Sequence, residues 1–130
     1  KDATKPLDYP HHKDKKVIDR INLLKPGQCN KDLPKELQCN YKSIYEKLNL
    51  NSTLGTIDNV YKRYLLSPIE KRVVSVREAM AFQGFPNEYE VITDSLMAAY
   101  QMVGNAVPVQ FAEVIAKSVR KALDRYYSNK

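Results

Sequence analysis

The chain has 130 residues, of which 43% are hydrophobic and 28% are charged, and its formal net charge is +6 at pH 7. This composition excludes wholesale disorder. The length fits one small domain or a part of a larger protein. No apolar run approaches the ~20 residues of a membrane span, so no membrane partner is expected. The positive charge favours an anionic partner, nucleic acid first, although moderate basicity is also common in proteins that bind none.

The first third of the chain contains one expected helix. Residues 1–16 are polar and lack periodicity, so we expect a flexible lead-in. Apolar residues at helical spacing predict a short amphipathic helix over Val17–Leu24, which a Pro-Gly pair stops. The two cysteines, Cys29 and Cys39, are too few for a zinc site or a disulfide framework, and we interpret them as reduced thiols of an intracellular protein.

The middle of the chain has a mixed pattern. Apolar and aromatic residues between positions 41 and 48 have helical spacing, and Leu54–Ile57 is compatible with a short strand. Further on, two tyrosines flank Lys62 and Arg63, a pattern that suits phosphate contact and base stacking. Two partly buried tyrosines beside solvated cations would give the same pattern, so both interpretations stay open.

A capping box predicts that a helix begins after Ser75, because Glu78 lies three residues further on. Gly84 suits the left-handed position that follows a helix, and Pro86 cannot continue one. We therefore expect a two-turn helix that delivers Phe85 at a tight exit.

A second tight turn is expected at Gly104–Pro108. Gly and Asn tolerate positive φ, and the Pro can occupy the first turn of the next helix. Such a turn exposes backbone N–H groups at a helix start, where an anionic or polar ligand group can be held. The helix that follows has apolar residues from Phe111 to Tyr126 at spacings of one, three and four, so one of its faces is expected to be buried.

The stretch from Arg72 to Val109 resembles the last two conserved motifs of the DNA (cytosine-5) methyltransferases. The penultimate motif is matched by Arg72, Ser75, Arg77, Glu78, Ala79, Gln83, Phe85 and Pro86, and the final motif by Gly104, Asn105, Ala106, Val107 and Pro108. Two motifs in the right order and at the right separation make a specific signal. Upstream, the residues from Val17 show a weaker similarity to the target-recognition region of a bacterial-type branch of this family.

The resemblance implies an α/β fold, present here only as the C-terminal part of a Rossmann-like methyltransferase. A small mixed recognition region would be followed by helices that pack on a catalytic sheet supplied by another chain or segment. The implied divisions are the lead-in over 1–16, part of the DNA-binding target-recognition region over 17–71, and the C-terminal motifs and helix over 72–130, which rejoin the catalytic domain.

The family's Gly-rich cofactor loop, Pro-Cys nucleophile loop and Glu-Asn-Val motif do not occur in this sequence. The chain therefore resembles the small subunit of a split enzyme, or a fragment of a longer one, and is expected to be inactive alone. Its implied partners are double-stranded DNA and a catalytic N-terminal portion, with which it would form a heterodimer that methylates C5 of a flipped cytosine. A catalytically inactive, methyltransferase-like DNA-binding or regulatory module is the alternative.

The resemblance also assigns residues. The implied cofactor is S-adenosyl-L-methionine, and the residues that would contact it are Phe85, Asn105, Ala106 and Val107. The residues that would organise the junction of the two regions are Arg72, Ser75, Arg77, Glu78 and Gly104. The aromatic and basic pattern described above adds Lys62 and Arg63 as candidate DNA contacts. No metal site and no catalytic residue is expected in this chain, and a bacterial or phage-host cytoplasm is expected rather than a nucleus.

Overall fold

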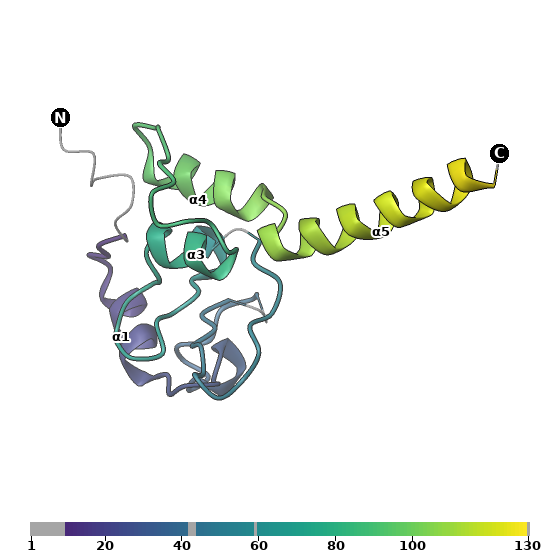
Figure 1. Cartoon of the computed structure of the whole chain (residues 1–130). Helices are drawn as coiled ribbons and strands as arrows, with labels where there is room; N and C mark the ends of the chain where they lie inside the picture. The colour runs from purple at the N-terminus through teal and green to yellow at the C-terminus, as the bar shows by residue number, and fades with distance from the viewer. Residues whose placement is uncertain (1–9, 42–43, 59, 130) are drawn as a thin grey trace.

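The structure is a computed structural model in which residues 10–41, 44–58 and 60–129 are described. Its helices are α1 (Lys15–Leu23), the short 3-10 helix η2 (Asn30–Asp32), α2 (Val60–Arg63), α3 (Val76–Phe82), α4 (Leu96–Asn105) and α5 (Val109–Ser128). Helices α1, α3 and α4 belong to one body, from which α5 projects as a long rod (Figure 1). Among the described residues, no helix is long and apolar enough to cross a membrane.

Helix α1 forms where the amphipathic pattern predicts a helix, with a start two residues earlier than expected. The Asp14 side chain caps its N-terminus by accepting a hydrogen bond from the Lys16 N–H at 2.8 Å. Val17 and Ile21 are buried against the core. The lead-in expected over 1–16 falls mostly outside the described residues, and its last two positions belong to α1.

The helix suggested by the spacing between residues 41 and 48 is wrong, because the described part of this segment is irregular. Its backbone bonds to distant parts of the chain: the Tyr45 N–H donates to the Arg63 carbonyl at 2.8 Å, and the Leu66 N–H donates to the Glu46 carbonyl at 2.7 Å. These long-range partners replace the bonds between residues four apart that a helix needs.

The strand suggested at Leu54–Ile57 is also wrong, since the described residues contain no strand. That segment is a loop with little cover, and a Cβ placed on Gly55 would have no neighbour within 4 Å. Two isolated bridges stand in the place of a sheet, a parallel one between Lys47 and Leu66 and an antiparallel one between Leu66 and Val73. The expected catalytic sheet therefore receives no strand from the part of the chain that is described.

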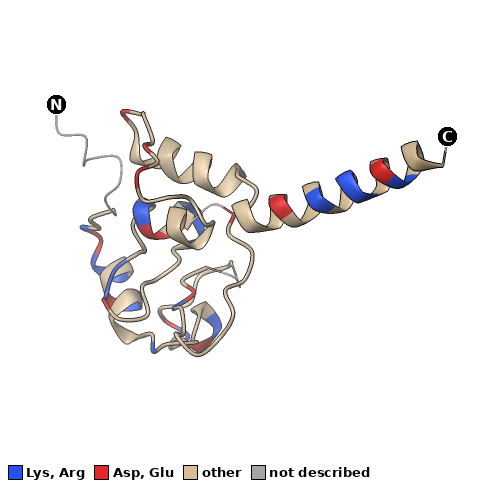
Figure 2. Ribbon diagram, in the orientation of Figure 1, with Lys and Arg blue, Asp and Glu red and all other residues tan. Residues whose placement is uncertain are grey.

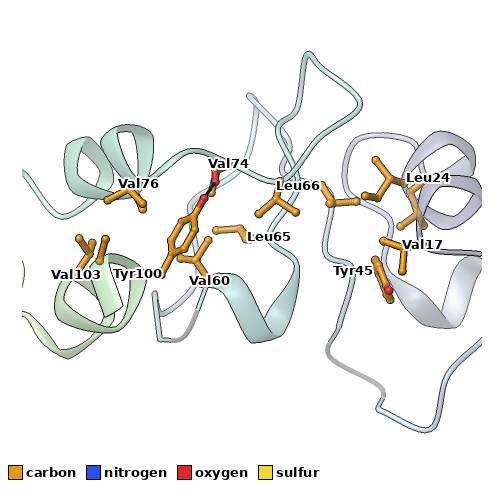
Figure 3. Close-up of a cluster of buried hydrophobic side chains, with 14 of the residues drawn as sticks. Val17, Leu24, Tyr45, Val60, Leu65, Leu66, Val74, Val76, Tyr100 and Val103 are labelled. Carbon is orange, nitrogen blue, oxygen red and sulfur yellow. Dashed lines mark hydrogen bonds between the residues drawn. The ribbon is translucent and has the colours of Figure 1, made fainter. Parts of the chain in front are cut away.

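The core runs from α1 and the segment around Tyr45, through α2 and the segment that precedes α3, to α3 and α4 (Figure 3). Leu66, Val74 and Val76 are among its fully buried side chains, together with Tyr100 of α4. The Tyr100 hydroxyl donates to the Val74 carbonyl at 2.6 Å, so this buried polar group is satisfied. Because Val74 directly precedes the cap of α3, this bond fixes α4 against the beginning of α3.

Helix α5 differs from the others because none of its residues is buried. The apolar stripe that the sequence predicts is present, and its large members are exposed: Phe111 58%, Ile115 46%, Val119 53%, Leu123 46% and Tyr126 56%. Ion pairs one turn apart, Glu113–Lys117 at 2.6 Å and Arg120–Asp124 at 2.9 Å, lie off this stripe. The face that is patterned for burial is thus left uncovered by the described chain.

Candidate functional site

The N-terminus of α3 is closed by the predicted capping box. The Glu78 N–H donates to the Ser75 hydroxyl at 3.1 Å, and the Ser75 N–H donates to the Glu78 carboxylate at 2.6 Å. Both bonds satisfy donors that would otherwise lack partners at a helix start. The prediction of a short helix that begins after Ser75 is confirmed.

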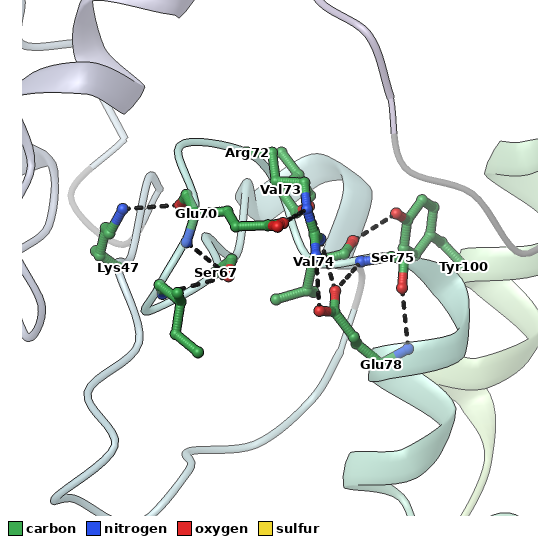
Figure 4. Close-up of polar contacts among 10 residues, drawn as sticks. Lys47, Ser67, Glu70, Arg72, Val73, Val74, Ser75, Glu78 and Tyr100 are labelled. Carbon is green, nitrogen blue, oxygen red and sulfur yellow. Dashed lines mark hydrogen bonds and ion pairs between the residues drawn. The ribbon is translucent and has the colours of Figure 1, made fainter.

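Arg72 holds the same carboxylate from the other side (Figure 4). Its Nη1 and Nη2 atoms donate to the two Glu78 oxygens at 2.7 and 2.9 Å, its Nη1 also donates to the Val73 carbonyl at 3.1 Å, and its Nε donates to Glu70. The hydrogen bonds from Arg72 hold the pKa of Glu78 below its ordinary value of 4.5, although partial burial opposes this shift. The same pairing raises the pKa of Arg72, which stays charged.

A buried lysine ties the expected recognition region to this junction. Lys47 is 5% exposed, and its Nζ donates to the Glu70 carbonyl at 2.9 Å (Figure 4). Burial, followed by the positive charge of Lys71, lowers the pKa of Lys47. The bond gives the buried ammonium group a partner in place of water. It also connects Lys47, in the middle segment, to Glu70, whose side chain pairs with Arg72.

Arg77 positions the loop that follows α3. Its Nη1 donates to the Tyr89 carbonyl at 3.0 Å. The ring of Tyr89 lies with its centroid 4.9 Å from the centroid of Phe85. Phe85 is half-buried and packs against the core cluster. The aromatic that the sequence places at the exit of α3 is therefore fixed on one side by the core and on the other by this loop.

The exit itself has the predicted backbone. Gly84 has a φ of +76°, the left-handed conformation that L side chains rarely adopt. It is also a point of close approach, because a Cβ at this position would lie 2.6 Å from the Gln110 Nε2 atom of α5. The positive φ thus favours glycine here, whereas the Gln110 amide is the end of an exposed, flexible side chain that can move aside.

The turn at Gly104–Pro108 differs from expectation in two respects. Gly104 and Asn105 do not have positive φ but form the last turn of α4, because the helix continues through the buried Val103. Pro108 is the N-cap of α5 rather than a residue of its first turn. The change of direction is made at Ala106, whose N–H still donates to the Val103 carbonyl at 3.2 Å.

Gln83 binds both sides of this turn, a role that the sequence did not assign to it. Its Nε2 donates to the Val103 carbonyl at 3.2 Å and to the Ala106 carbonyl at 3.4 Å. Its own carbonyl accepts from the Val109 N–H at 3.0 Å. The sequence does contain one sign of this role. Gln83 lies one turn after Ala79 on the buried face of α3, where an apolar residue would be expected.

The donors at the turn are fewer than predicted, because the N–H groups of Ala106 and Val109 are already bonded within the chain. Asn105 and Val107 are exposed. The Asn105 Oδ1 accepts from the Gln101 Nε2 at 2.8 Å, an exposed hydrogen bond between residues four apart on α4. Contact of Asn105, Ala106 and Val107 with a cofactor therefore stays a prediction.

The basic pair of α2 is used differently by its two members. The Arg63 guanidinium pairs with Glu46 at 2.7 Å and with Asp58 at 3.3 Å, and it also donates to the Thr56 carbonyl at 3.1 Å. Lys62 is exposed. Arg63 therefore organises the middle segment, whereas contact of either residue with DNA stays a prediction.

Beside this basic pair, the described tyrosine side chain, that of Tyr64, favours the interpretation of packing over that of base stacking. The ring of Tyr64 stacks on the buried Tyr45, with centroids 4.5 Å apart and planes at 28°. Both residues have positive φ, 50° and 58° respectively. Tyr64 is thus engaged in packing within the chain rather than placed to stack on a base.

Cys29 and Cys39 are both free thiols.

Residues 7–121 match the family model of the C-5 cytosine-specific DNA methylases. The chain belongs to this family of enzymes. Its relatives include the type II methyltransferase M.Sau96I of Staphylococcus aureus, 32% identical over 120 residues that cover 82% of this chain and 28% of the relative. M.MthTI of Methanothermobacter thermautotrophicus is 45% identical over 58 residues, which cover 45% of this chain and 18% of that protein.

A third relative is of similar length to this chain. The type II methyltransferase M.AquIB of Picosynechococcus is 32% identical over 117 residues, which cover 82% of this chain and 81% of the relative. Most of the longer relatives are therefore matched over a minor part of their length, whereas this one is matched over most of it.

Proposed function

We propose that the chain is the C-terminal part of a DNA (cytosine-5) methyltransferase and that it acts only together with a catalytic portion that carries the cysteine nucleophile. In this proposal the chain contributes target recognition on double-stranded DNA and one wall of the S-adenosylmethionine pocket. S-adenosylmethionine supplies the methyl group that is transferred to C5 of the flipped cytosine.

The observation that carries the proposal is the uncovered apolar face of α5. A row of exposed side chains from Phe111 to Tyr126 runs along a helix that projects from the body (Figure 1). A patch of this kind marks an interaction surface, since water makes its exposure unfavourable. A catalytic portion that packs on this face would bury it and would bring the Asn105–Val107 turn, which directly precedes α5, to the same interface.

The residues of this chain then have separate tasks. Asn105, Ala106 and Val107 would hold the amino-acid end of the cofactor, and Phe85 would border the pocket. Arg72, Arg77 and Glu78 keep α3 and its exit loop in place, so that the recognition region and the cofactor turn move as one unit. The nearly equal length of M.AquIB supports the view that a protein of this size can be a separate chain of such an enzyme.

The proposal is tested by mixing the purified chain with a family catalytic portion that contains the Pro-Cys loop. Transfer of labelled methyl groups from S-adenosylmethionine to duplex DNA is measured for each portion alone and for the mixture. We expect transfer only in the mixture. A stable complex that transfers no methyl groups would contradict the proposal and would favour the inactive regulatory module.

A matched pair of α5 variants tests the docking face. Val119→Glu places a charge on the apolar stripe, whereas Lys121→Gln changes the net charge by the same amount off the stripe. We expect the first variant to abolish complex formation in size-exclusion chromatography and the second to leave it intact. Equal behaviour of the two variants would show that the stripe is not the docking face.

A further inference from the structure

Three backbone segments meet at Gln83. The residue caps the C-terminus of α3, its side chain reaches the last carbonyls of α4, and its carbonyl receives the first N–H of α5. It is 3% exposed although its side chain is polar. Its burial is compatible with its polarity because the side-chain amide donates to carbonyls on the α4 side of the turn between α4 and α5.

The bonds hold the two ends of the turn to one residue. Before the turn, the Gln83 Nε2 donates to the carbonyls of Val103 and Ala106, at 3.2 and 3.4 Å. After the turn, the Val109 N–H donates to the Gln83 carbonyl at 3.0 Å. The intervening Asn105–Val107 segment has exposed or half-exposed side chains and little packing of its own. Core packing and the Tyr100–Val74 bond hold α4 against α3, and Gln83 adds bonds to both flanks of the exposed segment itself.

Helix α3 is itself fixed at both ends. Its beginning is closed by the bonds among Arg72, Ser75 and Glu78, and at its end the N–H groups of Gly84 and Phe85 donate to the carbonyls of Ala81 and Met80, both at 3.0 Å. The turn is thus attached, through Gln83, to a helix that is bonded at both ends. A residue in this place can set the position of a binding turn without touching the ligand.

We infer that Gln83 is the positioning residue of the cofactor turn, and that it holds Asn105–Val107 in the conformation that binds S-adenosylmethionine. This inference rests on the proposed function, because it takes the turn as part of the cofactor pocket. Gln83 does not contact the cofactor or the reacting atoms in this role. It acts through the two carbonyl groups and the N–H group that flank the turn.

The test compares Gln83→Glu, Gln83→Met and the control Gln28→Glu in the assembled enzyme. Glutamate replaces the donating amide by an oxygen that faces two carbonyls, and methionine removes the donor without a charge. Gln28→Glu makes the same charge change in a loop after α1, where the side-chain oxygen that accepts from the Lys25 N–H at 2.9 Å is retained.

Two readouts separate positioning from general support of the fold. Titration with S-adenosylmethionine is expected to show a dissociation constant raised about tenfold or more in both Gln83 variants but not in Gln28→Glu, as the loss of buried hydrogen bonds predicts, with the duplex affinity of the Gln83 variants within about twofold of the unaltered enzyme. Hydrogen exchange of the free chain is expected to become faster in the segment 104–112, with the exchange of α3 unchanged.

The outcomes are distinct. Unchanged cofactor affinity, or an equal loss of cofactor and duplex affinity with faster exchange throughout the body, would overturn the positioning role. If the unaltered assembled enzyme binds duplex DNA but not S-adenosylmethionine, the proposed function fails instead, and the exchange of 104–112 in the Gln83 variants still reports whether the residue holds the turn.

Discussion

At the scale of single residues, the Glu78 carboxylate is central to the junction before α3. Its carboxylate accepts from two nitrogens of Arg72 and from the Ser75 N–H, so one group links the segment before α3 to the helix itself. Such charge-assisted bonds are stronger than those between neutral groups. If one partner is removed, the other is left partly buried without a hydrogen bond, which costs free energy because the group has lost its contact with water.

Replacement of Glu78 by Gln should lower the free energy of unfolding by about 2 kcal/mol at pH 7. We expect a modest value for charged hydrogen bonds because the Glu78 side chain is partly exposed to water. The pKa of Glu78 is lowered in the folded chain, so its contribution is present above the ordinary value of 4.5 and is lost as the pH falls through the folded value. Chemical denaturation at several pH values measures both effects.

The difference between the unaltered chain and Glu78→Gln should therefore shrink below pH 4.5. Glu36→Gln, in an exposed part of the loop after η2, provides the control and should change stability little at any pH. A difference that stays constant down to low pH would show that the ion pair does not account for the effect.

Gly84 makes a second prediction at this scale. Gly84→Ala should cost about 1–2 kcal/mol, mainly because the residue has positive φ and to a smaller extent because the new Cβ displaces the exposed Gln110 amide. The double variant with Gln110→Ala removes the steric part and should recover some of this loss, while the backbone part remains. Thermal unfolding of the two variants measures the difference, and identical melting temperatures would exclude contact with Gln110 as a cause.

At the scale of elements, the sequence predicts the features that depend on neighbouring residues, and it does not predict the features that depend on long-range bonds. The beginning of α3 and its exit were predictable because Ser75, Glu78 and Gly84 act within one or two turns of the chain. The middle segment was not, because Tyr45 bonds to the backbone of Arg63, and no local pattern encodes such a partner.

The candidate site divides in the same way. The motifs identify Asn105 and Phe85 as candidates, but the role of Gln83 depends on carbonyl groups twenty residues away and more. The positive φ expected at Gly104 and Asn105 fails for a related reason. The tolerance of these residues permits a left-handed turn, but burial of Tyr100 and Val103 extends α4 through them.

Helix α5 provides a prediction at the element scale. Its ion pairs at Glu113–Lys117 and Arg120–Asp124 stabilise the helix only slightly, and no residue of the helix is buried. Backbone amides beyond the first turns should therefore exchange rapidly in the chain alone. On assembly with a catalytic portion they should become strongly protected, while α4 changes little. Protection of α5 that is already high in the isolated chain would contradict this expectation.

At the scale of the whole molecule, charge is spread rather than gathered on one element (Figure 2). The net charge of +6 gives a general attraction to DNA, but several cations are already engaged within the chain. Arg72 and Arg63 are held by carboxylates, and the cations of α5 lie on a helix whose other face is proposed to dock on protein. The salt dependence of binding shows which cations reach phosphates, because each such contact releases counterions.

The assembled enzyme should bind duplex DNA with an affinity that falls as salt rises, and Lys62→Gln should reduce the slope of this dependence by about one, the effect of a single phosphate contact. Lys121→Gln makes the same charge change on α5 and should leave the slope unaltered. Arg63→Gln should act mainly on stability, since its guanidinium pairs with Glu46 and Asp58. Equal slopes for the Lys62 and Lys121 variants would remove Lys62 from the DNA interface and would leave recognition to other parts of the segment before α3.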